Sequence, residues 1–353
     1  MNKSKLTLLI DGNWLLMSRL SVITNSYIDD NELCKNLQLL MIQSIKKVIK
    51  KFPIIDNIIF CTDGGSWRND LEIPETVRDD EGHIIYYKGN REKSADINWE
   101  LVFSAYEKLI SQFKQYGINS YKEHSIEGDD LLWYWSQKLN KEGTNCIIWT
   151  KDNDLKQLVN INNDKCFCVW WNEQNGMFVK DFNDDDLDFL FNNDYNENDA
   201  IFKAITNNIQ ITKLDGNYII IDKIIRGDAG DNIMPVLYKQ SPKSTRKYRI
   251  SPNDIDYSMN WKDDQVVYNY FDSLLKTKKY SKNVSKSLKD IIQHFNYNRQ
   301  LVALDKDYYP KQIIETLNEL DYKNSEDNIN GIYIIENNIR SDINNLNGII
   351  DFI

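Results

Sequence analysis

Residues 5–11 read KLTLLID, a short apolar run that ends in an aspartate, and this arrangement recurs twice along the chain. Residues 57–63 read NIIFCTD, and residues 145–154 read NCIIWTKDND. Residues 165–171, KCFCVWW, form a fourth run. Short apolar runs rich in β-branched and aromatic residues, bounded by polar segments, predict buried strands.

Helical patterns separate these strands. Apolar residues recur at spacings of three and four in residues 31–52 and again in residues 99–113, and a third such segment follows Asp130. Strands that alternate with helices are typical of a mostly parallel sheet covered on both faces. We therefore predict an α/β fold.

Acidic residues follow each of the first three strands, at Asp11, at Asp63, and at Asp152 with Asp154. Functional groups in parallel sheets collect beyond the carboxyl ends of the strands. So many carboxylates at one edge repel one another unless cations neutralise them. Oxygen ligands without histidine or cysteine indicate a hard ion, Mg²⁺ or Mn²⁺.

The stretch SIEGDDLLWYW, residues 125–135, adds Glu127 and Asp129 where a helix begins near the same edge. Alone, this cluster is better explained by helix capping or by a solvated face, and a single aspartate after a strand by a turn. The convergence of four segments favours a metal site.

Composition narrows the class of protein. The chain has 353 residues, 41% hydrophobic and 27% charged, which suits one large or two medium soluble domains. No apolar run approaches the roughly 20 residues that span a bilayer, and the first residues lack a signal peptide. The five cysteines form no CxxC pair, and the three histidines show no zinc spacing. We expect a cytoplasmic monomer without zinc or histidine-based chemistry.

Charge and pattern change in the second half. The net charge of −10 argues against a polyanionic partner, but residues 243–249 carry four cations and residues 276–289 carry six lysines without an acid. Asp228 and Asp231 stand at i and i+3 in GDAGDN, on one side of a helical turn. The later pattern is helical and polar, and residues 240–265 read as a loop.

Six motifs occur in a fixed order: LLIDGNW, FCTDGGSWR, YYKGNREK, IEGDD, TKDND and GDAGDN. Together they resemble the 5′-nuclease (flap endonuclease) superfamily with its PIN-like fold, and within it the bacteriophage enzymes of ribonuclease H type. Residues 298–310 and 331–346 also resemble the family's C-terminal segment, so the resemblance covers nearly the whole chain.

The resemblance implies a PIN-like nuclease domain over residues 1–205, with an arch at about 64–98. It implies a helical DNA-binding domain over 206–353. A degenerate helix-three-turn-helix motif is expected there, because residues 234–250 lack the family's glycine-rich hairpin.

The resemblance also implies two Mg²⁺ ions, for which Mn²⁺ can substitute. The first would be held by Asp11, Asp63, Glu127 and Asp129. The second would be held by Asp228 and Asp231, with Asp152 and Asp154 between the two. Asp130 is expected to cap the helix or lie outside the ligand shell.

Catalytic roles are expected for Asp129 and Asp152 at the metals and for Lys88 and Arg91 of the arch, which would face the scissile phosphate. The expected nucleic-acid contacts come from the arch and from the basic segment that follows GDAGDN: Trp67, Arg68, Tyr86, Tyr87, Lys88, Arg91, Lys239, Lys243, Arg246, Lys247 and Arg249. Packing of the arch is an equally good explanation of Trp67.

The expected function is Mg²⁺-dependent 5′→3′ exonuclease and flap-endonuclease cleavage of flapped, nicked or forked DNA and RNA–DNA duplexes, as in primer removal by a bacteriophage protein in the host cytoplasm. A sliding clamp and a single-strand-binding protein are candidate partners. The tail NGIIDFI at 347–353 would dock in the clamp, although a packed or frayed terminus explains it better. A PIN-type ribonuclease and a catalytically inactive structure-specific DNA-binding protein are the alternatives.

Overall fold

The computed structural model describes residues 6–24, 30–79, 81–91, 97–161, 166–180, 197–237, 239–241, 244–248, 250–281, 286–322 and 327–350. The chain divides into two compact units. Unit 1 comprises residues 1–65, 94–214 and 315–353, and unit 2 comprises residues 66–93 and 215–314. Each unit is described by itself.

Unit 1 is built on a mixed sheet whose strands run in the order β3-β2-β1-β4-β6-β7-β8, with β5 paired to β6. The pairs from β3 to β6 along this order are parallel, as is β7 with β8, whereas β6 is antiparallel to β5 and β7. The predicted α/β class is confirmed. The strands are β1 (Leu6–Asp11), β2 (Asn57–Cys61), β3 (Asn119–Tyr121), β4 (Asn145–Trp149), β5 (Asn160–Ile161), β6 (Phe167–Asn172), β7 (Gly176–Lys180) and β8 (Ile211–Leu214).

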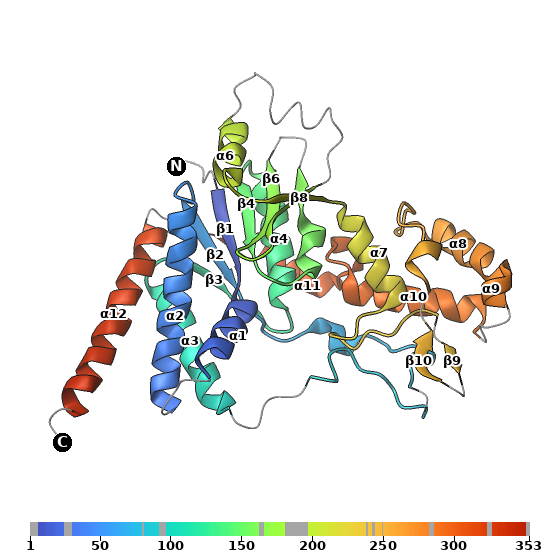
Figure 1. Ribbon diagram of the computed structural model, residues 1–353, viewed down its shortest axis with the longest axis horizontal. Helices are drawn as coiled ribbons and strands as arrows, with labels where there is room; N and C mark the ends of the chain where they lie inside the picture. Colours follow the sequence, from blue (N-terminus) through green and yellow to red (C-terminus); the bar gives the residue numbers. More distant parts are fainter. Residues whose placement is uncertain are drawn as a thin grey trace. The chain divides into compact units, whose positions relative to one another are not determined.

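Helices cover both faces of this sheet (Figure 1). Alternate residues of β1, such as Leu8, join one continuous core with α1, α2, α3, α6 and α12. The buried residues of α4 lie outside that core, and α4 packs against β1, β2 and β4. The helices are α1 (Gly12–Ile23), α2 (Asp30–Lys51), α3 (Trp99–Gln115), α4 (Gly128–Lys141), α6 (Glu197–Thr206) and α12 (Asp327–Ile350), and a short 3-10 helix, η2, spans Asp154–Leu158.

The compact units divide the chain differently from the predicted domains in three places. Residues 206–214, expected in the C-terminal helical domain, belong to unit 1, where β8 pairs with β7. Residues 315–353, expected in the C-terminal helical domain, belong to unit 1, because Ile332, Ile335 and Ile339 of α12 are buried in the core that α2 also lines. Residues 66–93, expected as an arch of the nuclease domain, belong to unit 2, because Val77 is buried in its core. The amphipathic pattern indicates that a segment must be covered, but it does not identify the partner.

Unit 2 is mainly helical, and its core joins α7, α8 and α10 through residues such as Ile224, Phe271 and Phe295. A two-stranded antiparallel hairpin, β9 and β10, begins where a loop is predicted. The elements are η1 (Trp67–Asp70), α7 (Gly216–Arg226), β9 (Lys239–Ser241), β10 (Ser244–Tyr248), η3 (Pro252–Asp254), α8 (Asp264–Lys276), α9 (Lys278–Ser281), α10 (Leu288–Val302) and η4 (Lys306–Tyr308), while α11 (Lys311–Asn318) crosses the division between the units.

Among the helices that the structure describes, none combines the length and the apolar character that a membrane crossing requires.

Candidate metal centre

The carboxyl ends of β2, β1 and β4 lie side by side, because the three strands are parallel and in register. Ile10 of β1 pairs with Phe60 of β2 and with Trp149 of β4. Asp11, the last residue of β1, therefore lies at the sheet edge where β2 and β4 also end and the polar segments after them begin. The predicted convergence of acidic segments at one edge is present in unit 1.

Asp11 is the N-cap of α1 and is 6% exposed. Its Oδ1 accepts the Trp14 N–H at 2.9 Å, and its Oδ2 accepts the Thr150 hydroxyl at 2.7 Å. Burial is the main cause that raises the pKa of Asp11 to about 7, and the negative charges of Asp152 and Asp63 raise it as well. The two hydrogen bonds lower the pKa, but they only partly offset these effects. A carboxylate that is so costly to ionise is stabilised by a neighbouring cation, so this site fits a metal ion.

Both oxygens of Asp63 are held by the protein. Oδ1 accepts the Gly128 N–H at 2.7 Å, and Oδ2 accepts the side-chain amide of Asn13. The orientation of that amide is set in turn, because its oxygen accepts the Thr62 hydroxyl, and Thr62 accepts the buried Tyr106 hydroxyl at 2.8 Å. A Cβ at Gly128 would lie 3.1 Å from Oδ1 of Asp63, so glycine permits the close approach.

The start of α4 places Glu127 and Asp129 near the same sheet edge, and a third acid, Asp130, caps the helix. Glu127 is the N-cap and is buried, and its N–H donates to Oδ2 of the buried Asp130 at 3.1 Å. Asp130 thus has the capping role expected for it. This first turn of α4 lies against the end of β2, since a Cβ at Gly128 would lie 3.7 Å from the Cys61 carbonyl oxygen. Burial raises the pKa of the Cys61 thiol, and the nearby charges of Asp11 and Asp129 raise it further.

In the loop after β4, hydrogen bonds fix both the backbone and the side chain of Asp152. The Thr150 hydroxyl oxygen accepts the Asp152 N–H at 2.9 Å, and Oδ1 of Asp152 accepts the Asp154 N–H at 2.8 Å. The indole of Trp170 donates to the Asp152 carbonyl at 2.9 Å. Thr150 therefore connects Asp11 with Asp152 through one hydroxyl.

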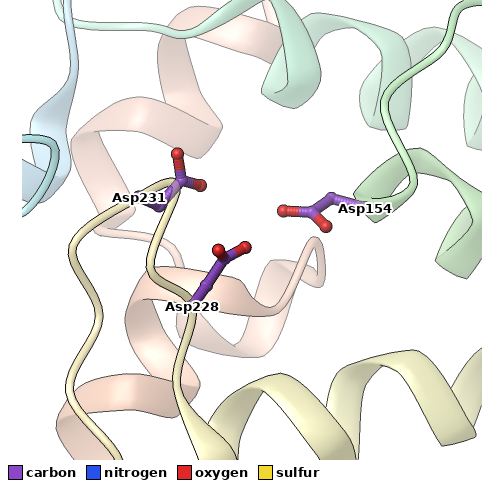
Figure 2. A group of neighbouring side chains, drawn as sticks. All are labelled: Asp154, Asp228 and Asp231. Carbon is purple, nitrogen blue, oxygen red and sulfur yellow. The ribbon is translucent and has the colours of Figure 1, made fainter. Parts of the chain in front are cut away.

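A second acidic pair lies in unit 2, on the turn that follows α7. One carboxylate oxygen of Asp228 and one of Asp231 lie within 4.8 Å, which suits a shared cation. Burial alone would raise the pKa of Asp228, but the ammonium of Lys223 and the N–H groups of Gly230 and Asp231 outweigh it and lower the pKa. Figure 2 shows the side chains of this pair, and it also labels Asp154 from the loop of unit 1.

Lys88 and Arg91, the predicted cations of the arch, belong to the same unit as this pair. The guanidinium of Arg91 is more than half exposed and lies 2.6 Å from Oδ1 of Asp231. The Lys88 N–H donates to the Asp231 carbonyl at 2.8 Å, and its ammonium lies 4.8 Å from the centre of the Tyr87 ring.

Trp67 and Arg68 lie in the interior, at 3% and 2% exposed. The Trp67 ring meets Tyr309 edge-on at 5.4 Å, and the Arg68 guanidinium lies 4.5 Å from the Trp67 ring centre and donates from Nε to the Leu301 carbonyl at 2.9 Å. Packing is therefore the better explanation of Trp67. The nucleic-acid contact predicted for Arg68 is wrong for this structure, because its guanidinium is committed to the packing of unit 2.

The two tyrosines of the predicted arch, Tyr86 and Tyr87, differ in exposure. Tyr86 is 59% exposed, whereas Tyr87 packs against the core of unit 2. Of the predicted basic contacts, Lys239 lies in β9, and Arg246 and Lys247 lie in β10. Lys243 and Arg249 lie outside the described residues.

Sequence reasoning missed the neutral residues that orient the acids, namely Thr150, Thr62, Tyr106 and Asn13. A signal for three of them exists. Thr62 and Thr150 are each the first residue after a strand, one and two positions before an acid, and Asn13 follows IDG directly. Only Tyr106 has no local signal, because its role depends on the packing of α3.

Residues 6–183, about half of the chain, match the family model described as "5′-3′ exonuclease, N-terminal resolvase-like domain". This chain belongs to the 5′-3′ exonuclease family. The expected resemblance is confirmed at that level. A curated 5′-3′ exonuclease of Buchnera aphidicola is 28% identical over 160 residues, which are 42% of this chain and 49% of that protein. The chain thus spans about half the length of the curated relative it matches.

Solved structures of a bacteriophage T5 protein resemble this family member over nearly its whole length. The T5 flap endonuclease in a pseudo-enzyme–product complex with DNA and metal ions is 17% identical, with a TM-score of 0.52 over 94% of this chain and 100% of that chain. A T5 protein co-crystallised with metal ions is 16% identical, with a TM-score of 0.49 over 96% of this chain and 99% of that one. At this identity the first of these likenesses supports the fold alone.

Proposed function

We propose that this family member is a divalent-metal-dependent 5′→3′ nuclease that cleaves flapped, nicked or forked DNA and RNA–DNA duplexes. The observation that carries the proposal is the gathering of Asp11, Asp63 and the loop 150–154 at one sheet edge, beside the acidic first turn of α4. Family membership supports the same reaction, since the matched relative is named a 5′-3′ exonuclease.

The proposed cofactor is Mg²⁺, with Mn²⁺ as a substitute, because the donors are carboxylate oxygens. Asp11, Asp63, Glu127 and Asp129 would hold one ion. The order of the motifs supports a second ion at Asp228 and Asp231, with Asp152 and Asp154 as further ligands.

The chemistry that bound ions would supply is polarisation of the scissile phosphate and a lower pKa of the attacking water. The protein's part is to orient the ligands and to counter charge. Thr150 fixes Asp11, and Asn13 with the Gly128 N–H fixes Asp63. Lys88 and Arg91 would stabilise the charge that spreads over the phosphate oxygens in the transition state.

The proposed substrate contacts lie in unit 2. Tyr86 is open to stack on an unpaired base, an interaction worth ~1–3 kcal/mol. The basic segment 239–249 would contact the duplex backbone, which makes binding steeply salt-dependent. We place the activity in primer removal during replication, in the host cytoplasm if the chain is of bacteriophage origin, with a sliding clamp and a single-strand-binding protein as candidate partners. Residues 351–353 of the tail lie outside the described residues.

The experiment that tests this function offers the protein three labelled substrates with Mg²⁺: a 5′-flap duplex, the same flap with its 5′ end blocked by a bulky group, and a circular structured RNA. We expect cleavage of the free flap, slow cleavage of the blocked flap and none of the circle. Cleavage of the circular RNA at the rate of the flap would contradict the proposal and favour a PIN-type ribonuclease.

A further inference from the structure

Within unit 2, four hydrogen bonds join the segment 86–91 to the turn 228–232, and both segments contribute donors. They are Asn232 Nδ2 to the Tyr86 carbonyl (2.8 Å), Lys88 N–H to the Asp231 carbonyl (2.8 Å), Asn90 Nδ2 to the Ala229 carbonyl (2.9 Å) and Arg91 Nη2 to Oδ1 of Asp231 (2.6 Å). Three of the four use a backbone carbonyl as acceptor, so the contact fixes the course of both chains and not only two side chains.

The backbone at this contact is unusual on both sides. Lys88 has a φ of 54° and Asn232 a φ of 57°, both in the left-handed region that residues other than glycine rarely adopt. Asparagine tolerates this conformation, whereas lysine does so less readily. Backbone outliers that surrounding hydrogen bonds maintain are concentrated at functional sites.

We propose that Asn232 and Asn90 are positioning residues, which hold the basic segment 86–91 on the acidic turn 228–232. The cations of Lys88 and Arg91 and the carboxylates of Asp228 and Asp231 then form one preorganised group. The inference rests on the proposed function, since it assigns these asparagines to the same reaction.

Neutral amides suit this role. An amide donor holds a carbonyl without adding a charge beside the carboxylates, so it does not compete with a cation for them. Charge stabilisation in phosphoryl transfer depends on placement, and a shift of about 1 Å can cost about 10²-fold in rate. A segment that carries two catalytic cations therefore benefits from a fixed attachment.

The test uses Asn232→Gly, which removes the donor to Tyr86 while glycine still permits the left-handed backbone. The chain offers a matched control in unit 1. Asn208, with a φ of 59°, is exposed, and Asn208→Gly makes the same replacement at the same backbone conformation away from any proposed site.

Amide hydrogen exchange gives a readout that does not depend on activity. We expect faster exchange over residues 86–91 in Asn232→Gly, with unchanged exchange in β1 and β4, and no change over residues 86–91 in Asn208→Gly. Unchanged exchange over 86–91 in Asn232→Gly would overturn the proposal, whether or not the protein proves to be a nuclease.

Kinetics then distinguish positioning from a general structural role. In flap cleavage we expect Asn232→Gly to lower kcat about tenfold, with KM within about twofold. In a Lys88→Ala/Arg91→Ala background the same change should cost less than about twofold, because both cations that it positions are gone. Equal losses in both backgrounds would show that Asn232 does not act through these two cations and would overturn the proposal. A native protein without nuclease activity would refute the proposed function and leave the exchange result to decide the attachment.

Discussion

Thr150 links two of the candidate ligands, because its hydroxyl donates to Asp11 and accepts the N–H of Asp152. Thr150→Val keeps the shape of the side chain and removes both hydrogen bonds. We expect the affinity for Mn²⁺ to fall by about tenfold or more, as is usual when a partner that orients a ligand is lost. Calorimetric titration with Mn²⁺ measures this, and Thr150→Ser, which keeps the hydroxyl, is the control. Equal affinities for Thr150→Val and the native protein would contradict the role.

Asp11 predicts the pH dependence of stability without metal. Burial, with the charges of Asp152 and Asp63, raises its pKa from 3.8 to about 7, so between these values the folded state binds a proton that the unfolded state has lost. Folding is thus favoured by this group at low pH, and the stabilisation is lost as the pH rises from about 4 to about 7.

The measurement is the free energy of unfolding in EDTA across that pH range for the native protein and for Asp11→Asn. We expect the difference between the two proteins to change with pH in this direction, and saturating Mg²⁺ to stabilise the native protein most at the high end. A difference that does not vary with pH in EDTA would contradict the burial argument.

At the scale of elements, the first turn of α4 separates two adjacent aspartates by role. Asp130 caps the helix through the Glu127 N–H, whereas Asp129 lies near the end of β2. We expect Asp130→Ala to lower the free energy of unfolding by about 1 kcal/mol and to keep cleavage at saturating metal. Asp129→Asn should do the opposite, with cleavage lost and stability kept. Urea unfolding and flap cleavage of both variants check this, and loss of cleavage in both with stability unchanged would contradict the division.

The strands and the acids that follow them could be predicted from the sequence, because an apolar run ending in Asp11 or Asp63 carries its signal locally. The 66–93 segment could not. The sequence around Trp67 and Arg68 suits both stacking on bases and packing, and only the tertiary contacts with Tyr309 and Leu301 decide between them. The same holds for Tyr106, whose link to Asp63 passes through Thr62 and Asn13.

At the scale of the whole molecule, the return of the C-terminal helix to unit 1 gives a stability prediction. Ile335 of α12 is fully buried in the core of unit 1, and its neighbour Ile334 is 45% exposed. Ile335→Ala should lower the free energy of unfolding by about 2–5 kcal/mol, whereas Ile334→Ala should change it by less than about 0.5 kcal/mol. Thermal melting of the two variants compares them directly, and similar melting temperatures would place α12 outside the core of unit 1.

The sequence could not assign residues 315–353 correctly, because the apolar spacing of α12 is compatible with either unit. Only the folded structure shows that Ile332 and Ile335 pack in the core that α2 lines. A domain boundary predicted from a change in pattern therefore misses a segment that returns to the first unit.

The central claim is that the acids at the edge of the unit 1 sheet hold metal for cleavage of nucleic acid. The most direct test compares the native protein, Asp129→Asn and the control Asp342→Asn, an exposed aspartate of α12, on a 5′-labelled flap duplex with Mg²⁺ or EDTA. We predict short labelled products with Mg²⁺ from the native protein and the control, and none from Asp129→Asn, which should still bind the flap. Binding of the flap by the native protein without cleavage in either Mg²⁺ or Mn²⁺ would contradict the claim.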